Sequence, residues 1–437
     1  MAARARRDSR FFCLLRPRWS WHDEDVNAQR RVPAPPAWSK NLFTVGVTGT
    51  NGKTTTTAWV AAALRRLAAS SGAGPVARAT TVGFFLDEEE RKIEKSYDGF
   101  MAGMRECFDR GGRLAAIELT SEALANGFAR AWECRVGVFT NLTHDHLDAH
   151  GSPEHYLASK AQLFVSLQPG ATAVLNAGDP VFELLREVLP EGVKLLSYAV
   201  PSRGPSQGSP DLVARAVEVS WAGTRITCDV RDEASGLPRE LHVRAIGGVY
   251  AENALAALLG AVAAGVAPAE ACAALAEAPP PPGRFEVIHE RPYVVVDYAH
   301  SPDALARTVQ IARSLADGQS GKLTVVFGAG GKRDKAKRGP MGEAARPADR
   351  VILTTDNPRD EDPAEIARAL AEGLRGHAAV ETVLDREKAI TRALEGAGEA
   401  DVILVAGKGH ETEQLIGTEV RHFSDVDVAR AAVRARA

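Results

Sequence analysis

The stretch that decides the fold, residues 45–55, reads VGVTGTNGKTT. Its β-branched start, Val45–Thr48, predicts a buried strand, and the Ala-rich segment at 54–67 predicts a helix. Small residues between a strand and a helix let backbone amides close around phosphate oxygens. Lys53 adds a positive charge, and the hydroxyl of Thr54 can bind magnesium. The stretch therefore predicts a phosphate-binding loop, made of Gly49, Thr50, Asn51, Gly52, Lys53, Thr54 and Thr55.

The same alternation of apolar strand and helix continues after the loop. Apolar runs at 114–119 and 136–141 are each followed by a segment of helical pattern, at 121–130 and 153–165. Strands that alternate with helices are typical of a parallel sheet covered by helices. Between about 214 and 245, shorter runs with polar alternation predict an antiparallel extension of that sheet.

A run of four prolines and a glycine, residues 279–283, divides the chain. Such a run cannot continue a helix and is typical of a linker or hinge. A second series of buried strands follows it, which predicts a separate, doubly wound, Rossmann-like α/β domain. We therefore expect an N-terminal tail at 1–41, a central domain with a mostly parallel sheet at 42–280, and a C-terminal domain at 281–437.

The charge balance and the cysteines indicate the class of protein. The 437 residues include 53 basic and 56 acidic side chains, for a formal net charge of -3, so no overall field favours nucleic acid or an anionic membrane. No stretch approaches the roughly 20 apolar residues that span a bilayer. The five cysteines are widely spaced without a CxxC pair, which favours a reducing compartment over a disulfide framework. We expect a cytoplasmic protein without nucleic-acid or membrane partners.

Two candidate metal ligands follow predicted strands of the central domain. Glu118 stands near the end of the apolar run at 114–119, and His146 comes shortly after the run at 136–141. Open α/β sheets bind ligands at the carboxyl ends of their strands, so both side chains should converge on the phosphate loop. A carboxylate and an imidazole suit a magnesium ion beside phosphate oxygens. Lys160, by contrast, would by itself be interpreted as a solvated helix lysine.

The form of the phosphate loop resembles that of one enzyme family. Val47 stands where the general motif G-x-x-x-x-G-K-S/T has its first glycine. Residues 48–55 instead match T-G-T-N-G-K-T-T, the form found in the Mur ligases, which build the peptidoglycan stem peptide, and in the related folylpolyglutamate synthetases. The resemblance extends from Leu42 through nearly all of the chain. It implies a central P-loop ATPase domain in a ligase that phosphorylates a carboxylate with ATP and couples the acyl phosphate to an amino acid.

The resemblance also implies a metal site. In the family, the residues that match Glu118 and His146 are magnesium ligands. Lys160 matches a family lysine that carbon dioxide carbamylates, which turns an ammonium into an anionic oxygen ligand beside a second magnesium. We therefore expect two magnesium ions and a carbamate on Lys160. The expected catalytic residues are Lys53, Glu118, His146 and Lys160, and the expected metal ligands are Thr54, Glu118, His146 and carbamylated Lys160.

Further matches imply contacts to ATP from both domains. Asn253 resembles the asparagine that contacts the nucleotide, although Tyr250 replaces a second asparagine of the family pattern. Asn176 and Asp179 lie in another loop of this kind. In the C-terminal domain, the residues that match ATP-binding motifs are Arg284, Asp297 and His300.

The C-terminal domain resembles that of the ligases that add meso-diaminopimelate. Residues 328–338 form a strongly cationic loop. Residues 356–359 read D-N-P-R, a sequence in which the arginine binds the distal carboxylate of the amino acid as a bidentate fork. Residues 407–411 read G-K-G-H-E, a loop that receives the distal amino group and carboxylate. The amino-acid-binding residues that the resemblance implies are Arg333, Asp356, Asn357, Arg359, Gly407 and Glu411.

Three departures from the family concern the acceptor. Mur ligases have a further N-terminal domain of roughly a hundred residues that holds a uridine nucleotide, where this sequence has the tail at 1–41. Residues 96–99 replace a Thr-Thr-Pro that touches the muramoyl substrate. Phe128 stands where the family has an acceptor-binding arginine, with Arg130 two positions on. We therefore expect a non-standard carboxylate acceptor, or a partner protein that supplies acceptor binding.

Three alternatives stay open. The chain could be an orthodox stem-peptide ligase whose uridine-nucleotide binding is supplied in trans. It could also be a folylpolyglutamate synthetase, although the sequences at 356–359 and 407–411 argue against that. The third alternative is a non-catalytic scaffold that binds a nucleotide and a partner enzyme, and the intact set of metal-binding residues argues against it.

Overall fold

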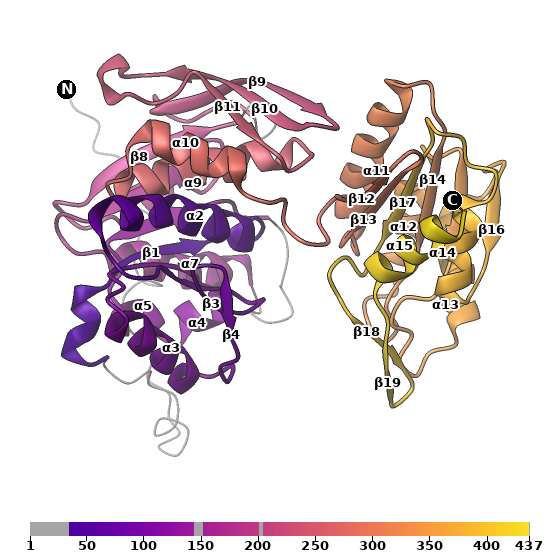
Figure 1. The fold of residues 1–437 in the computed structure, drawn as a ribbon, viewed down its shortest axis with the longest axis horizontal. Helices are drawn as coiled ribbons and strands as arrows, with labels where there is room; N and C mark the ends of the chain where they lie inside the picture. The colour runs from indigo at the N-terminus through magenta and orange to yellow at the C-terminus, as the bar shows by residue number, and fades with distance from the viewer. Residues whose placement is uncertain (1–34, 144–151, 201–203, 437) are drawn as a thin grey trace. The chain divides into compact units, whose positions relative to one another are not determined.

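The computed structural model describes residues 35–143, 152–200 and 204–436, which fall into two compact units. The N-terminal unit ends at Ala278, and the C-terminal unit begins at Pro279, the first proline of the run. The short segments Val219–Gly223 and Ala245–Gly247 belong to the C-terminal unit. Figure 1 labels the helices and strands of each unit.

Within the described part of the chain, one eleven-stranded sheet organises the N-terminal unit, in the order β11-β10-β9-β8-β7-β6-β1-β5-β2-β3-β4. Strand β1 pairs in parallel with β5 on one side and β6 on the other, so their carboxyl ends meet at one edge. β10 and β11 pair antiparallel, as the polar alternation at 214–245 predicts. The strands are β1 Phe43–Thr48, β2 Ala77–Ala79, β3 Phe84–Leu86, β4 Glu89–Arg91, β5 Leu114–Glu118, β6 Val136–Phe139, β7 Thr172–Asn176, β8 Lys194–Ala199, β9 Leu212–Ser220, β10 Gly223–Val230 and β11 Glu240–Val243.

Helices cover both faces of this sheet (Figure 1). α2 packs against α9 and α10 on one face, and α7 contacts β1 and α4 on the other. Because α9 is buried on nearly every side, its sequence is almost entirely apolar. The helices are α2 Lys53–Ser71, α3 Tyr97–Asp109, α4 Ser121–Ala125, α5 Phe128–Ala131, α7 Pro153–Val165, α8 Phe182–Glu187, η3 Glu233–Ser235, α9 Val249–Ala263 and α10 Pro268–Glu277.

The last residues of the expected N-terminal tail at 1–41 are folded. Ala37–Asn41 forms a short 3-10 helix, η1, immediately before β1. Its Trp38 packs against Phe108 and Trp132, with ring centroids 5.5 Å and 6.4 Å away. The pattern of residues 1–41 does not predict this helix, because its stability comes from contacts with aromatic rings far along the chain.

The C-terminal unit contains a six-stranded sheet in the order β12-β13-β17-β14-β15-β16. All neighbours pair in parallel except β12, which is antiparallel to β13 at one edge. A separate hairpin, β18–β19, pairs with Arg359 through a parallel bridge from Ile416. The strands are β12 Glu286–Glu290, β13 Tyr293–Asp297, β14 Leu323–Phe327, β15 Arg350–Leu353, β16 Val380–Thr382, β17 Val402–Ala406, β18 Glu413–Ile416 and β19 Glu419–His422.

The second sheet is doubly wound, because successive residues of its strands enter two different cores. Val295 packs in a core with α11, α12 and α13, whereas Val294 and Val296 pack in a core with α14 and α15. This arrangement explains why the strands read as continuous apolar runs. The helices are α11 Pro302–Asp317, α12 Arg338–Ala344, α13 Pro363–Ala371, η4 Glu372–Leu374, α14 Arg386–Leu394 and α15 Asp425–Arg436.

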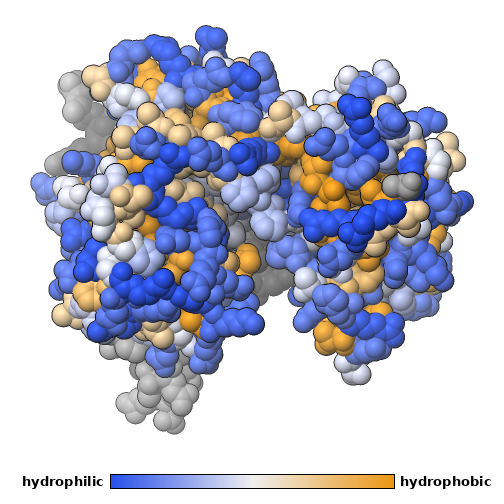
Figure 2. Space-filling view, in the orientation of Figure 1, coloured by the Kyte–Doolittle hydropathy of each residue, from blue (hydrophilic) through white to orange (hydrophobic). Residues whose placement is uncertain are grey.

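The surface agrees with this burial of apolar residues. On the face drawn in Figure 2, hydrophilic residues cover most of each unit, and apolar patches are smaller. Over the three described ranges, no helix combines the length and the apolar character needed to cross a membrane.

Candidate active site

The phosphate loop joins β1 to α2 at the carboxyl edge of the first sheet. Gly49 and Gly52 have positive φ angles of 150° and 82°. A Cβ on Gly49 would lie 1.9 Å from Thr140 Oγ1, and one on Gly52 would lie 2.0 Å from Asn253 Oδ1. Both positions therefore require glycine for steric as well as backbone reasons. Lys53 folds back over the loop and donates from Nζ to the Thr50 carbonyl, 2.8 Å away.

Two of the predicted metal ligands lie together beside the loop. The Thr54 hydroxyl donates to Glu118 Oε2 at 2.8 Å, because Glu118 ends β5 next to the carboxyl end of β1. The backbone amide and the hydroxyl of Thr81 donate to the same oxygen, at 3.1 Å and 3.2 Å. A hydroxyl and a carboxylate at a phosphate loop form a donor set that fits magnesium. His146, the third predicted ligand, lies outside the described residues.

Lys160 is buried rather than solvated. It lies on α7, only 1% of its surface is exposed, and its Nζ donates to the Gly49 carbonyl at 2.6 Å. The ammonium also lies 4.3 Å from the centroid of the Tyr156 ring, whose hydroxyl donates to Thr50 Oγ1 at 3.2 Å. The side chain thus contacts the phosphate loop. In the described ranges, no group of three or more His, Cys, Asp or Glu side chains is arranged to hold a metal ion.

A buried hydrogen-bond network supports the phosphate loop from behind. Glu252, on α9 and 3% exposed, accepts from Asn141 Nδ2 at 3.1 Å and from Asn176 Nδ2 at 2.6 Å. Asn141 in turn accepts from the Asn51 amide at 3.0 Å and donates to the Asn51 carbonyl at 3.2 Å. The network therefore fixes the loop backbone at Asn51, between the two glycines.

Asn176 and Asp179 belong to this supporting network. Both are completely buried, so neither presents a surface to a nucleotide. Asp179 Oδ2 accepts from the Leu142 amide at 2.7 Å. These two residues hold the segment that carries Asn141.

Asn253 differs from its neighbours in the network. Its Oδ1 is buried, faces Gly52 and has no hydrogen-bond donor among the described residues. A buried polar atom without a partner is costly. The Oδ1 atom thus lies against the backbone of the phosphate loop at Gly52.

In the C-terminal unit, the predicted nucleotide-binding residues surround Tyr298. The Arg284 guanidinium lies 4.5 Å from the Tyr298 ring centroid, and the His300 ring lies 4.6 Å from it. Burial raises the pKa of Tyr298, and the nearby Glu411 carboxylate raises it further. Burial, followed by the charge of Arg284, lowers the pKa of His410, whose ring lies 5.2 Å from Tyr298.

Asp297 holds the segment that carries Arg284. Its carboxylate accepts from the Phe285 amide at 2.7 Å, from the Ala299 amide at 2.8 Å and from the Thr308 hydroxyl at 3.1 Å. Burial raises the pKa of this carboxyl group, although the same hydrogen bonds and Arg284 oppose the rise. The three donors all come from the C-terminal unit itself.

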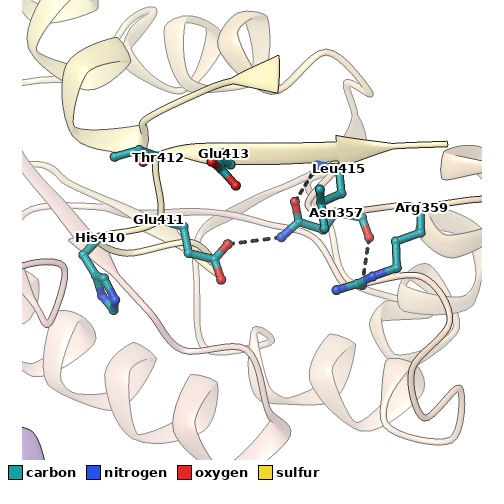
Figure 3. Close-up of a pocket in the computed structure, with 7 residues that line it drawn as sticks. All are labelled: Asn357, Arg359, His410, Glu411, Thr412, Glu413 and Leu415. Carbon is teal, nitrogen blue, oxygen red and sulfur yellow. Dashed lines mark hydrogen bonds between the residues drawn. The ribbon is translucent and has the colours of Figure 1, made fainter. Parts of the chain in front are cut away.

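The predicted amino-acid-binding residues meet in one pocket, because four parallel strands of the second sheet end at the same edge. Figure 3 shows Asn357 between Glu411 and Arg359. Asn357 Nδ2 donates to Glu411 Oε2 at 3.1 Å. Arg359, in the left-handed region at φ 54°, donates from Nη1 to the Gly331 carbonyl at 2.8 Å. The residues that line the pocket are Asn357, Arg359, His410, Glu411, Thr412, Glu413 and Leu415.

The other predicted substrate residues adjoin this pocket. Gly407 is required because a Cβ there would lie 2.6 Å from Asp356 Oδ2, which is itself mostly buried. A Cβ on Gly330 would lie 3.2 Å from Arg359 Nη1 and 3.5 Å from Arg333 Cγ, so both arginines flank Gly330. The cationic loop and the D-N-P-R segment are therefore neighbours.

Several supporting residues are absent from the sequence-based predictions. Arg386 is completely buried and pairs with Asp425, with both hydrogen bonds at 2.7 Å. It also donates to the carbonyl of Thr355, two residues after β15, and to that of Ala406, the last residue of β17. Lys408 is likewise buried, and so is Glu252. A charged residue within an apolar helix is a signal for Glu252, and Lys408 lies within the G-K-G-H-E loop at 407–411, whereas the sequence around Arg386 gives no comparable signal.

The region expected to face the acceptor is aromatic. The Phe128 ring lies 5.3 Å from Phe100 and 6.3 Å from Tyr97, and Phe100 lies 5.0 Å from Trp132. Ser96 caps α3 by accepting from the Gly99 amide at 3.1 Å. These contacts give the residues that differ from the family pattern a packing role.

The chain matches two family models: the Mur ligase middle domain at residues 47–261 and the Mur ligase glutamate ligase domain at 283–409. A UDP-N-acetylmuramoyl-L-alanyl-D-glutamate--2,6-diaminopimelate ligase of Geobacillus kaustophilus is 35% identical over 418 residues, which cover 90% of this chain and 79% of the relative. The ligase of the same name from Ralstonia nicotianae is 37% identical over 415 residues, with 93% and 78% covered.

Solved structures agree with the sequence comparison. A structure of a UDP-N-acetylmuramoyl-L-alanyl-D-glutamate--2,6-diaminopimelate ligase superposes with a TM-score of 0.65 at 31% identity, and covers 90% of this chain and 79% of that one. The Mycobacterium tuberculosis folylpolyglutamate synthase bound to ADP has a TM-score of 0.66 at 18% identity, with 91% of each chain covered, and shares the fold. The predicted α/β fold and the predicted family are thus confirmed: the chain belongs to the Mur ligases, a family of ATP-dependent, ADP-forming ligases.

Proposed function

We propose that this chain couples meso-diaminopimelate, or an amino acid with the same distal group, to a non-standard carboxylate acceptor through an acyl phosphate. The observation that carries the proposal is the pocket in which Asn357, Arg359 and Glu411 lie together. Relatives at 35–37% identity are named for ligation of 2,6-diaminopimelate, which supports the same amino acid here.

The charges of the pocket fit a zwitterionic distal group. The Arg359 guanidinium can bind a carboxylate through two parallel hydrogen bonds. The Glu411 carboxylate, on the other side of Asn357, can accept from an ammonium group. Lysine has the ammonium but no distal carboxylate, so its binding would leave the guanidinium without that partner. Loss of such a hydrogen-bonded partner gives strong discrimination between substrates.

The residues of the phosphate loop fit the first half-reaction. Lys53 and the loop amides would orient the phosphates of ATP, so that the acceptor carboxylate attacks the terminal phosphoryl group and ADP leaves. Magnesium held by Thr54, Glu118, His146 and a carbamate on Lys160 would neutralise the charge that develops on the phosphates. The amine of the amino acid then attacks the acyl phosphate, which forms the amide and releases phosphate and a proton.

The carbamate on Lys160 is part of the proposal. Carbon dioxide would form a bond to the uncharged amine nitrogen of Lys160, which loses a proton and becomes an anionic oxygen donor. Two observations support a carbamate on Lys160. The side chain is only 1% exposed, and a buried ammonium is costly. Its Nζ also contacts the Gly49 carbonyl, so a carbamate there would lie beside the phosphate loop. Labelled carbon dioxide should give a carbamate carbon resonance that Lys160→Ala lacks, and a short carboxylic acid should restore part of that variant's activity.

The acceptor is proposed to differ from that of the named relatives. Phe128 packs among Tyr97 and Phe100, and an apolar ring cannot pair with an anionic substrate group. Arg130, two positions on, donates to Gln162 Oε1 at 3.0 Å. A less charged carboxylate, such as a peptide without its nucleotide, suits this surface better.

An acceptor screen tests the proposal. Purified chain, ATP, magnesium and meso-diaminopimelate are incubated with UDP-N-acetylmuramoyl dipeptide, with nucleotide-free peptides and with folate, and phosphate release and product mass are measured. Release that needs both an acceptor and the amino acid is expected, and it would exclude a non-catalytic scaffold. Efficient ligation onto UDP-N-acetylmuramoyl dipeptide by the chain alone would refute the non-standard acceptor. Ligation only after addition of a second protein would instead indicate acceptor binding in trans.

A further inference from the structure

Lys408 is a completely buried cation that contacts residues of the amino-acid pocket. It follows β17 by two residues, and its ammonium group meets three acceptors. Nζ lies 2.5 Å from the Glu413 carbonyl, 3.0 Å from Glu411 Oε2 and 3.4 Å from Asn357 Oδ1. An ammonium has three donors, so its hydrogen-bonding capacity is matched here.

Folding stability alone does not explain why a lysine is buried at position 408. A buried ion pair often contributes no more to folding than an apolar side chain of the same volume, because desolvation offsets the attraction. All three acceptors of Lys408 belong to residues that line the amino-acid pocket, Asn357, Glu411 and Glu413. Glu413 begins strand β18, whose Leu415 also lines the pocket.

The contacts of Lys408 determine how the pocket residues are oriented. Asn357 Oδ1 accepts from Lys408 and from the Leu415 amide at 3.0 Å, so its Nδ2 must face Glu411. Glu411 Oε2 then accepts from both Lys408 and Asn357. The Glu411 side chain remains 34% exposed, so its orientation is fixed while it still faces the pocket.

We propose that Lys408 is a positioning residue that selects an amino acid with a zwitterionic distal group. It orients Glu411 and Asn357, and its positive charge behind Glu411 disfavours a ligand that brings only another cation. A distal carboxylate beside the ammonium removes that penalty. The inference rests on the proposed amino-acid specificity and deepens it.

Lys408→Met tests the inference in the full-length chain. The KM for meso-diaminopimelate should rise about tenfold, as expected for one lost charged contact, while kcat and the KM for ATP stay within about twofold. The kcat/KM for lysine should fall less than that for meso-diaminopimelate, or rise. The ratio of the two kcat/KM values, which measures the preference for meso-diaminopimelate, should therefore decrease. Val402→Ala, at the other end of β17, is the control. It should lower Tm without changing the KM for meso-diaminopimelate or the KM for ATP.

A double-mutant cycle separates positioning from a general structural effect. If Lys408 acts through Glu411, Lys408→Met should add little to the KM defect of Glu411→Gln. Fully additive defects, or an unchanged KM in Lys408→Met, would overturn the inference. Lys408→Gln retains donor groups and should give an intermediate KM, which keeps the comparison informative if the methionine variant folds poorly.

Crystal structures test the inference independently of activity. In Lys408→Met, or in Lys408→Gln if only that variant folds, the Glu411 carboxylate and the Asn357 amide should take new orientations relative to the unaltered chain. Unchanged orientations would overturn the positioning role even if the chain couples none of the amino acids tested. Failure of the unaltered chain to couple any of them would count against the proposed function alone.

Discussion

Glu252 supports the phosphate loop through two asparagine side chains. Both of its carboxylate oxygens accept from amide NH2 groups, those of Asn141 and Asn176. Glu252→Gln replaces one acceptor with an NH2 group that would face another NH2 group in a buried site. We expect this variant to lose about 1–3 kcal/mol of unfolding free energy. Its KM for ATP should also rise, because Asn141 holds the loop at Asn51.

Urea denaturation and steady-state kinetics check this prediction. Glu277→Gln is the matched control, because Glu277 also lies on a helix of the N-terminal unit but pairs with Arg66 at the surface. Removal of an exposed pair should change stability by less than about 1 kcal/mol. Equal stability losses in the two variants would contradict the supporting role of Glu252.

Sequence reasoning is more effective for the loop residues than for those that support them. Gly49, Lys53 and Thr54 lie in a continuous motif whose backbone shape is local, so a pattern can predict the site. Glu252 depends on Asn141, 111 residues away in the sequence, and Arg386 depends on Asp425, 39 residues away. A lone charged residue on a helix is usually solvated, so the burial of Arg386 follows only from the assembled fold.

At the scale of elements, Glu361 organises the cationic loop at 328–338. Its Oε1 accepts from the Lys332 amide at 2.5 Å, and its Oε2 accepts from Arg338 Nη2 at 2.9 Å. These two hydrogen bonds lower the pKa of the Glu361 carboxyl group to about 2, and the bond from the Lys332 amide has the larger effect. Because the folded state keeps the carboxylate ionised, Glu361 stabilises the fold above its ordinary pKa of 4.5.

Comparison with Glu361→Gln should reveal this contribution as a function of pH. The unaltered chain should be the more stable near pH 7, and its advantage should shrink as pH falls from about 5 towards 2. Guanidinium denaturation at several pH values measures the difference, with Glu387→Gln on the exposed face of α14 as a control. An advantage that persists unchanged to pH 3 would rule out the hydrogen-bonded carboxylate as its source.

The pair of Arg386 and Asp425 joins α14 and α15 to the carboxyl edge of the second sheet. Neither side chain is exposed, and Arg386 also binds the carbonyls of Thr355 and Ala406. Asp425→Ala would leave the guanidinium buried without its counter-charge, which costs about 3–5 kcal/mol. Thermal denaturation should show this loss, whereas Glu419→Ala, which breaks an exposed pair with Arg421, should be nearly neutral. A small effect of Asp425→Ala would mean that water reaches Arg386.

Strands and helices that form from a local sequence pattern can be predicted from the sequence, whereas those that depend on distant contacts cannot. β1, β5 and β17 read as apolar runs because parallel strands are buried on both faces. β2–β4, of three residues each, were not predicted, because such short strands depend on their neighbours in the sheet. The same reason applies to η1, which depends on the packing of Trp38 against Phe108 and Trp132.

At the scale of the whole molecule, the chain consists of two units that each bury a separate core. The cores of the C-terminal unit form around its own sheet, and one core of the N-terminal unit involves residues of strands from β2 to β8. Units with separate cores can unfold in separate transitions, so a single two-state description need not apply. The phosphate loop lies in the N-terminal unit, and the amino-acid pocket lies in the C-terminal unit.

Ligands should therefore stabilise the two units selectively. ADP with magnesium at about 100 times its Kd adds about 2.7 kcal/mol to the unit that binds it, which corresponds to roughly 5–10 °C in Tm for a domain of this size. In calorimetry, ADP with magnesium should raise one transition, and meso-diaminopimelate should raise the other. Lys53→Ala should abolish the ADP shift and keep the amino-acid shift, because Lys53 Nζ contacts the Thr50 carbonyl of the phosphate loop in the N-terminal unit. A single transition raised equally by both ligands would contradict independent unfolding, and an intact ADP shift in Lys53→Ala would contradict the phosphate-binding role of Lys53.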